Sequence, residues 1–315
     1  MFNPVKVPDL DLLRRTIGEG LASVGWPEPA WFETTPEDAG RGQTAKAVAD
    51  GAELVFVCGG DGTVMAAVTA LAGTDVALAV LPAGTGNLLA ANLGLGADAA
   101  TGVQVAIDGG RKRIDVGTVG DQCFAVMAGM GFDAEMLEGT SDTAKKHIGW
   151  LAYVGGAVKH LRNRPMSIRI KLDGGKPVRR HPRTVIVGNV GRLQGGVRLL
   201  TEASPDDGKL DVAILSPRNL GHWVSLGWAV IRRSDRVPRM ETYSAERVEI
   251  LSTKVQPRQL DGDLIDPGRS MQIHIKPRAL LLCVPQPDSD PDLAYDSSAA
   301  HRAAEGVRAA AKEAE

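Results

Sequence analysis

Short apolar runs alternate with helix-like segments over the first hundred residues. Glu53–Cys58 and Val76–Leu81 are nearly continuous apolar runs, as expected of strands in a parallel sheet that is buried on both faces. Each run is followed by a segment with helical spacing, Val64–Leu71 and Leu88–Leu93. This alternation predicts an α/β domain with helices packed on a parallel sheet, which we assign to residues 1–112.

The pattern changes near Arg113, where strand-like runs begin to follow one another with turn signals between them. One helical stretch, Ile148–Leu161, interrupts the series. Repeated short strands predict an antiparallel, β-rich second domain over residues 113–284. The remaining residues, 285–315, form an acidic, Ala-rich tail that is either a helix packed back on the first domain or disordered. The strand-like runs are IDVGTV, CFAVMAGMGF, MSIRIKL, RTVIVGNV, LDVAIL, RVEIL, MQIHI and ALLLCV.

The composition is that of an ordinary globular protein, with 43% hydrophobic and 23% charged residues and a net charge of −2. No apolar run approaches the roughly 20 residues that a membrane-spanning helix requires. The N-terminus lacks the pattern of a signal peptide. We therefore expect a cytoplasmic protein whose contact with membrane, at the inner face, is peripheral. Cys58, Cys123 and Cys283 each lie in an apolar run without zinc or redox spacing, which predicts buried thiols.

The first apolar run leads directly into the sequence Gly59-Gly60-Asp61-Gly62-Thr63 and then a helix. Glycines leave backbone N–H groups uncovered, and a helix N-terminus adds unpaired donors and a partial positive charge. Together these features predict a phosphate-binding loop. Thr63 is suited to cap the helix or to donate its hydroxyl to a phosphate. Asp61 is unfavourable beside a polyphosphate unless Mg²⁺ or a substrate proton lies between them, so it has either a chemical role or the plain role of satisfying turn amides.

A second glycine-rich turn follows the next apolar run. Gly84, Thr85 and Asn87 lie in the sequence PAGTGN, and a helix again comes directly after it. Turns that follow adjacent parallel strands meet at the edge of the sheet where α/β proteins bind their ligands. Two such turns in tandem indicate a nucleotide site more strongly than one.

GGDGT followed about twenty residues later by PAGTGN-LLA resembles the catalytic domain of the diacylglycerol kinase and sphingosine kinase superfamily, in its bacterial lipid-kinase branch. The resemblance implies a Rossmann-like nucleotide domain, a second β-sandwich domain and an active site in the cleft between them. It also implies transfer of the γ-phosphate of ATP to a lipid hydroxyl, with a diacylglycerol-like or sphingoid-like acceptor. Further similarities, in chain order, are Asn3-Pro4, Ile114–Gly117, Ala128–Asp133, Lys145–Gly149 with Ala152-Tyr153, Asp206–Asp211 and Asp261–Asp263.

The same resemblance assigns residues to ATP. It places the phosphates on residues 59–63, with the second turn also at the nucleotide and Asn3 approaching from the first turn of the chain. A family threonine at the end of the second strand corresponds to Thr35 or its neighbour Thr34, and we assign Thr35.

The proton acceptor implied by the resemblance is Asp263, which stands where the family has Glu in an Asp-Gly-Glu motif. An Asp-Gly pair between strands is also a strong hairpin signal, so a plain turn is the alternative. Asp61 is a second candidate for the acceptor; we assign proton acceptance to Asp263, and Mg²⁺ or nucleotide to Asp61. A structural Mg²⁺ is implied near the Asp-Asp-Gly turn, on the Asp207 carboxylate and the carbonyls of Ser204 and Lys209, where a solvated turn is the alternative.

Residues 159–192 are strongly basic, with ten Lys and Arg residues against one acid, Asp173. Trp223 and Trp228 lie close to Arg232-Arg233 in a segment suited to an interface. We expect peripheral contact of the second domain with an anionic membrane. A solvated strand face with a core helix is the alternative. Nucleic acid is not expected, because no stacking platform of aromatic and basic residues is present.

Two other functions share some of these motifs. NAD kinases have GGDGT, but they also have a Gly-x-Leu-Gly-Phe turn and an Asn-Glu pair that this chain lacks. A non-catalytic nucleotide- or lipid-binding regulator would keep the fold, but it would have no use for Asp61, Thr63 and Asp263. Only Met1 and Phe2 precede Asn-Pro, where the family has several apolar residues, so we expect the chain as given to lack part of its opening strand.

Overall fold

The computed structural model of the chain describes residues 1–83, 88–92, 98–131, 165–191, 200, 203–217, 221–222, 225, 228 and 237–285. Its described residues divide into two compact units, residues 1–114 with residues 278–285, and Asp115–Pro277. The predicted helix Ile148–Leu161 and the whole tail after Pro285 lie outside the described residues.

A parallel sheet forms the centre of the first unit. β1 (Leu54–Gly59) pairs in parallel with β2 (Ala77–Pro82), and β2 pairs in parallel with the end of β12 (Asp263–Cys283). Phe2 adds a parallel bridge to Cys58 on one side and to Glu33 on the other. Nearly every residue of β1 and β2 is buried, as their continuous apolar runs predict.

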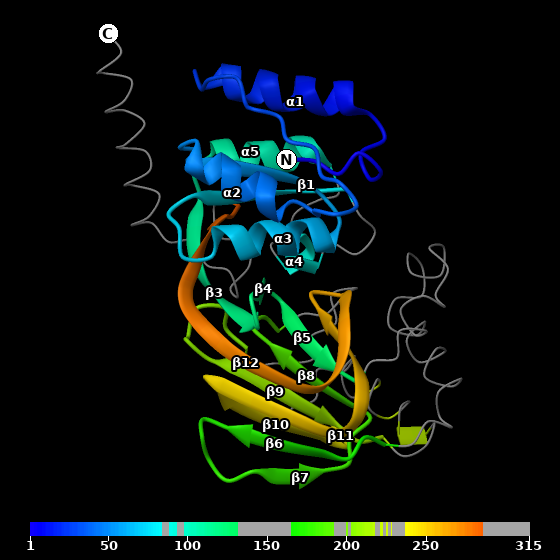
Figure 1. Cartoon of the computed structure of the whole chain (residues 1–315). Helices are drawn as coiled ribbons and strands as arrows, with labels where there is room; N and C mark the ends of the chain where they lie inside the picture. Colours follow the sequence, from blue (N-terminus) through cyan, green and yellow to red (C-terminus); the bar gives the residue numbers. More distant parts are fainter. Residues whose placement is uncertain are drawn as a thin grey trace. The chain divides into compact units, whose positions relative to one another are not determined.

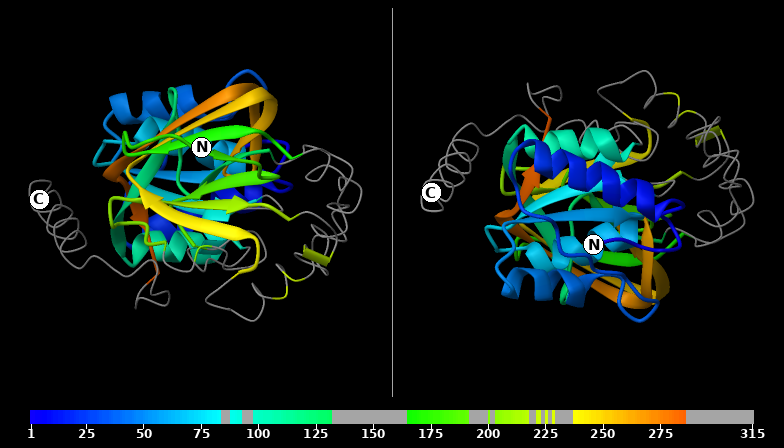
Figure 2. Two further views of the ribbon diagram at one scale, coloured as in Figure 1. Left: turned by 90° about the horizontal axis from the view of Figure 1, so that it is seen from below. Right: turned by 90° about the horizontal axis from the view of Figure 1, so that it is seen from above.

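Helices cover both faces of this sheet (Figure 1). α3 (Asp61–Leu71) packs on β1 and β2, and α5 (Ala99–Ile107) packs on β2. α1 (Leu10–Ser23) lies along α5, as the view from above in Figure 2 shows. The other helices are α2 (Arg41–Ala49), which packs on α3, and α4 (Leu88–Asn92).

The second unit is an antiparallel β-sandwich. Its strands form two branches of one hydrogen-bonded sheet, β5-β8-β9-β10 and β12-β11-β6-β7. β11 takes part in both, because its first half pairs with β6 and its last residues pair with β5. The remaining strands are β3 (Arg111–Val119), β4 (Gln122–Phe124), β5 (Met127–Met130), β6 (Ile168–Leu172), β7 (Val178–Arg180), β8 (Thr184–Gly188), β9 (Leu210–Leu215), β10 (Met240–Ala245) and β11 (Arg247–Leu260).

Several sequence expectations are confirmed by these elements. The parallel α/β arrangement and the antiparallel second unit are both present, and Cys58, Cys123 and Cys283 are buried free thiols. MQIHI and ALLLCV do not form separate strands, because both lie within the 21-residue β12. No helix in the described part of the chain is long and apolar enough to span a membrane.

The phosphate loop, the Asp-Gly-Asp turn and the family of the chain

Parallel bridges bring three predicted nucleotide residues to one edge of the first unit's sheet. Glu33, Phe2 and Cys58 are consecutive neighbours across the sheet, so the residues that follow each of them leave at the same edge. Asn3 and Gly59 therefore follow adjacent strands, and Thr35 lies two residues after the bridge at Glu33. This edge is the carboxyl end of the strands, where open α/β sheets bind ligands.

The loop Gly59–Thr63 ends in an uncapped helix. α3 begins at Asp61, and its N-cap residue Gly60 supplies no side-chain hydrogen bond to the first turn. The first amides of such a helix have no partner within the helix, so they are available to an anion. A Cβ atom added at Gly60 would meet no atom within 4 Å, which leaves the approach to these amides open.

Gly59 has a different role from Gly60. A Cβ atom at Gly59 would lie 2.7–2.8 Å from the Cβ, Cγ2 and Oγ1 atoms of Thr63, closer than packed atoms allow. Thr63 is 4% exposed, so its side chain cannot move aside easily. Gly59 therefore lets the strand pass close to the first turn of α3, and Thr63 packs against it rather than capping the helix as the N-cap residue.

Asp61 connects the two glycine-rich turns. Its Oδ1 atom accepts a hydrogen bond from the backbone N–H of Leu88, the first residue of α4, at 2.6 Å. The contact satisfies one of the amides that α4 leaves unpaired at its N-terminus. Asp61 therefore has at least the turn-satisfying role that the sequence left open. Gly84, Thr85 and Asn87 of the second turn lie outside the described residues.

Asn3 and Thr35 hold local turns at the same edge. The Asn3 side-chain oxygen accepts the Val5 N–H at 3.0 Å, and the Asn3 N–H donates to the Cys58 carbonyl at 2.9 Å. The Thr35 hydroxyl accepts the Asp38 N–H at 3.2 Å and is exposed, whereas Thr34 is 4% exposed. Of the two threonines, Thr35 is the one whose side chain faces solvent.

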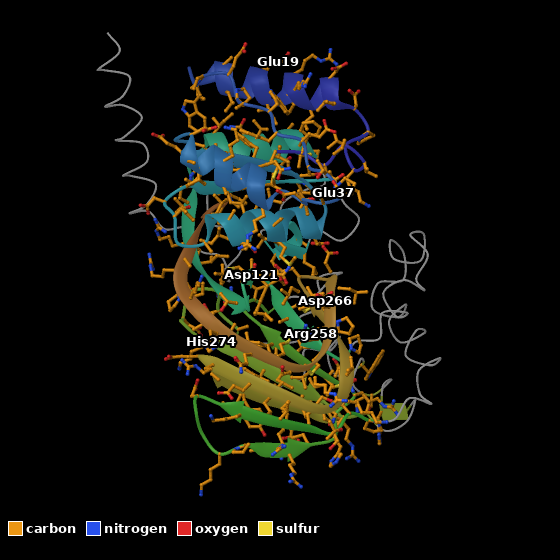
Figure 3. The ribbon with its side chains drawn as sticks, in the orientation of Figure 1. Glu19, Glu37, Asp121, Arg258, Asp266 and His274 are labelled. Atoms are coloured by element: carbon orange, nitrogen blue, oxygen red, sulfur yellow. The ribbon has the colours of Figure 1, made fainter. Side chains whose placement is uncertain are left out.

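In the second unit, Asp261-Gly262 is the two-residue turn of the β11–β12 hairpin. Leu260 pairs with Asp263 across it, and φ is 48° at Asp261 and 95° at Gly262. Two positive φ values are typical of a type I′ turn, so the hairpin signal in the sequence is confirmed. Asp263 is the first residue of β12 and is partly exposed. Further along the hairpin, the Arg258 guanidinium donates to the carbonyl oxygens of Asp266 and Ser270, which joins the two strands (Figure 3).

The Asp261 carboxylate fixes this turn to β5. It accepts hydrogen bonds from the backbone N–H groups of Ala125, Val126 and Met127 at 2.8, 2.9 and 2.8 Å, and Asp261 is 4% exposed. Hydrogen bonds to an ionised acceptor are stronger than neutral ones, and three of them meet one buried side chain. In the sequence, Asp261 stands out only as part of the Asp-Gly hairpin signal and of the family motif, so its bonds to the three amides of residues 125–127 were not predicted.

Asp115 plays a similar part at the Asp-Asp-Gly turn. It is fully buried, and its Oδ2 atom accepts the Gly208 N–H at 2.6 Å. Within the turn, the Ser204 hydroxyl donates to Asp206, and the Lys209 N–H donates to Asp207 Oδ1 at 2.9 Å. Three carboxylates, those of Asp115, Asp206 and Asp207, thus take part in the hydrogen bonds of this turn. No group of three or more acidic, His or Cys side chains suited to a metal occurs among the residues described.

Two families match successive parts of the sequence. Residues 12–119 match the diacylglycerol kinase catalytic domain. Residues 126–284, half of the chain, match the YegS C-terminal, NAD kinase beta sandwich-like domain.

Curated relatives agree with these families. The protein of Pseudomonas putida named "Probable lipid kinase YegS-like" is 30% identical over 279 residues, which cover 87% of this chain and 90% of that protein. The diacylglycerol kinase of Mycobacterium tuberculosis is 32% identical over 176 residues, which cover 54% of this chain and 57% of that protein. The alignment therefore spans a little over half the length of the Mycobacterium relative.

Solved structures show the same fold. A diacylglycerol kinase from Bacillus anthracis superposes with a TM-score of 0.68 at 19% identity, covering 91% of this chain and 96% of the other. An NAD kinase from Archaeoglobus fulgidus in complex with ATP is more distant, with a TM-score of 0.52 at 12% identity over 90% and 92% of the two chains. At these identities the likeness concerns the fold alone. The two family matches and the Pseudomonas relative nevertheless cover most of the sequence, so the chain belongs to the bacterial lipid-kinase branch of the diacylglycerol kinase and sphingosine kinase superfamily.

Proposed function

We propose that this chain is an ATP-dependent lipid kinase that transfers the γ-phosphate to a lipid hydroxyl. The observation that carries the proposal is the uncapped N-terminus of α3, at the carboxyl edge of a parallel sheet, with open space over Gly60. The family supplies the reaction class, and the loop supplies the means to hold the phosphates.

In this proposal the amides of residues 60–63 bind the phosphates of ATP, and the helix N-terminus adds a favourable partial charge. Asn3 and Thr35 lie at the same edge and contact the nucleotide, and Gly84, Thr85 and Asn87 complete the site from the second turn. Asp61 has two tasks. One oxygen holds Leu88, which keeps the start of α4 beside the start of α3. The carboxylate also faces the Mg²⁺ that accompanies the nucleotide.

Asp263 accepts the proton of the acceptor hydroxyl. Phosphoryl transfer has a loose transition state, so positioning and charge neutralisation contribute more than base strength. The three amides that bind Asp261 support this role, because they hold the turn two residues before Asp263 in one place. A positioned general base contributes about 10²–10⁴-fold to the rate.

A structural Mg²⁺ fits the Asp-Asp-Gly turn. The Asp207 carboxylate and the carbonyls of Ser204 and Lys209 would hold it, and a bound cation there would neutralise the acidic turn. Asp115 positions the turn by accepting the Gly208 N–H, and it would not itself be a ligand of the ion.

The proposal is tested by incubating the full chain with γ-labelled ATP and Mg²⁺ in three parallel reactions, with a total bacterial lipid extract, with NAD, or with no acceptor. Label in a lipid that is extracted into organic solvent supports the proposal, and its identification names the acceptor. Label in NADP instead would make the chain an NAD kinase. Nucleotide binding without any transfer would make it a non-catalytic regulator.

A further inference from the structure

The outer face of the sheet β7-β6-β11-β12 is basic, and its register can be followed strand by strand. Arg179 on β7 lies opposite Arg169 on β6, and Arg169 lies opposite Leu251 on β11. Two residues along β6, Lys171 lies opposite Glu249. Because side chains alternate between the two sides of a strand, these residues share one face. We call Arg169, Lys171, Arg179 and Arg247 the basic face.

The opposite side of the same strands forms the core, which fixes the orientation of the basic face. Ile170 on β6 lies opposite Ile250 on β11, which lies opposite Met271 on β12, and all three are at most 3% exposed. A shift of register by one residue would bury the arginines and expose these apolar side chains. The basic face therefore faces away from the core as a consequence of the pattern of the sequence.

The charges of the basic face are largely uncompensated. Like charges directly opposite each other destabilise a sheet, yet Arg169 and Arg179 occupy such a pair. In the described part of the chain neither has an ion-pair partner, and only Lys171 has one, at 3.4 Å from Glu249. The nearby acid Asp173 uses its carboxylate on the backbone N–H groups of Glu246 and Arg247.

Arg247 belongs to the same face at the other end of the sheet. It lies opposite His274 on β12, and its Nε–H donates to His274 Nδ1 at 3.1 Å. Figure 3 labels His274, which lies in the middle of β12. The bond holds the Arg247 guanidinium against the face, and no carboxylate among the residues described forms an ion pair with it.

Protection of a sheet edge does not account for this arrangement. Charged residues on an edge strand prevent pairing with other chains, which would explain Arg179 on β7. Arg169 and Lys171 lie on β6, however, which is paired on both sides, and Arg247 lies on β11, which is also paired on both sides. By contrast, Arg180 points to the other side of β7, where its Nε–H donates to both carboxylate oxygens of Glu241, so it is not part of the face.

Apolar residues lie within and beside the cations. Leu251 is 46% exposed in the row formed with Arg169 and Arg179. Val255, further along β11, is 57% exposed, and Lys254 next to it is exposed as well. Exposed aliphatic side chains among uncompensated cations suit the interface of an anionic bilayer, where the cations meet headgroup charge and the apolar tips enter the headgroup boundary.

We propose that the basic face docks on an anionic lipid membrane, with Arg169 and Arg179 as its main charges and Leu251 as its apolar contact. The inference rests on the proposed function only to explain why the protein would dock, since a lipid acceptor is located in a membrane. Nucleic acid is disfavoured, because the described residues of the face include no Phe, Tyr or Trp that could stack on a base.

The test is co-sedimentation of the full chain with large vesicles of phosphatidylcholine, either alone or with about a third phosphatidylglycerol. Each exposed cation near such a surface raises the partition coefficient of a protein onto the vesicles roughly fivefold. The double variant Arg169→Gln with Arg179→Gln should therefore bind the anionic vesicles more weakly, on the order of 25-fold. A control variant, Arg15→Gln with Lys46→Gln, removes the same charge from exposed positions on α1 and α2 and should bind as the parent does. Leu251→Ala should weaken binding at both low and high salt.

Folding and catalysis are separated from docking in the same variants. Removal of the opposed arginines should leave the melting temperature unchanged or slightly raised, because it relieves repulsion. Transfer to a short-chain lipid in neutral detergent should also be unchanged, whereas transfer to acceptor in anionic vesicles should fall with binding. The proposal would be overturned by equal vesicle binding of the parent and the double arginine variant. It would also be overturned by binding that does not depend on the phosphatidylglycerol content of the vesicles. Absence of transfer in detergent by the parent would instead count against the proposed function alone.

Discussion

The Asp61 carboxylate accepts the backbone N–H of Leu88, 27 residues further along the chain, at 2.6 Å. One side chain of the first glycine-rich turn thereby caps the helix that follows the second. The contact gives a structural reason for an acid in a loop that otherwise favours anions. Asp61 thus has a structural role, the bond to Leu88, and a proposed chemical role, the interaction of its charge with Mg²⁺, and mutation can distinguish the two.

Replacing Asp61 should therefore have different effects with Asn and with Ala. Asn keeps an oxygen for Leu88, so the free energy of unfolding should stay within a few tenths of a kcal/mol of the parent, whereas Ala removes a helix cap and should cost about 1 kcal/mol. Both should lose Mg²⁺-dependent transfer, because both remove the charge. Urea unfolding and the labelled-ATP assay measure the two effects. An Asn variant that works at the parent rate would show that the charge of Asp61 has no part in the reaction.

Gly59 and Gly60 should respond oppositely to substitution by Ala. At Gly59 the new methyl group collides with Thr63, so the melting temperature should fall, with a cost typical of overpacking, about 1–3 kcal/mol. At Gly60 there is open space, so stability should be kept, while ATP affinity should fall if the phosphates occupy that space in the proposed site. Thermal unfolding and calorimetric ATP titration of both variants check this. Unchanged ATP affinity in Gly60→Ala and in the bulkier Gly60→Val would remove the loop from the nucleotide site.

Asp261→Ala should be among the most destabilising single changes in the second unit. It leaves the N–H groups of Ala125, Val126 and Met127 buried without their carboxylate, and loss of several hydrogen bonds to a charged group costs about 3 kcal/mol or more. Asp266→Ala, on the same hairpin but exposed, is the matched control and should change stability by less than about 0.5 kcal/mol. Similar urea midpoints for the two variants would contradict the role given to Asp261.

Asp263→Ala should reduce transfer by about 10²–10⁴-fold while ATP affinity and the melting temperature stay near those of the parent. The reason is that Asp263 is partly exposed at the start of β12, whereas the carboxylate that fixes the turn belongs to Asp261. Asp263→Glu, which restores the residue typical of the family, should keep activity. Full turnover by Asp263→Ala would transfer proton acceptance to Asp61.

The amino group of Met1 should make stability depend on pH near neutrality in protein produced with Met1 as its first residue. Burial lowers its pKa from 8.0 to about 6, although the nearby Cys58 acts in the opposite direction, and the group donates to the Phe56 carbonyl at 2.8 Å. The unfolded chain therefore binds a proton between pH 8 and 6 that the folded chain does not, so stability should fall as pH drops from 8 to 6, by up to about 2–3 kcal/mol.

A variant with residues added before Met1 serves as the control for this prediction. In this variant Met1 has a peptide N–H, which does not titrate. The fall in the free energy of unfolding between pH 8 and pH 6 should therefore be absent. Equal pH dependence of the two proteins would assign the effect to other groups.

The features that local sequence determines were predictable. β1 and β2 follow from continuous apolar runs, and the loop at residues 59–63 follows from its glycines and the helix after it. Short or polar strands were not predictable: β7 has three residues, two of them arginines, and β10 reads METYSA without regular alternation. β12 was predicted as two strands, MQIHI and ALLLCV, because Pro277 interrupts the apolar pattern between them, whereas in the structure Pro277 lies within one continuous strand.

Contacts between distant parts of the chain were beyond prediction from the sequence. The bonds from Asp261 span 134–136 residues, and the bond from Gly208 to Asp115 spans 93. No pattern of spacing encodes such pairs. The basic stretch at residues 159–192 was visible as charge, but only the register of β6, β7 and β11 separates Arg169 and Arg179 from Arg180, which pairs with Glu241 on the other side of β7. Lys159, Arg162, Arg164 and Arg192 of that stretch lie outside the described residues, as do Trp223, Arg232 and Arg233.

The most direct measurement is a crystal of the chain soaked with Mg²⁺ and a non-hydrolysable ATP analogue. The uncapped start of α3 predicts phosphate oxygens within hydrogen-bonding distance of the backbone N–H groups of residues 60–63. Nucleotide density elsewhere on the protein, with these amides facing only water, would contradict the account.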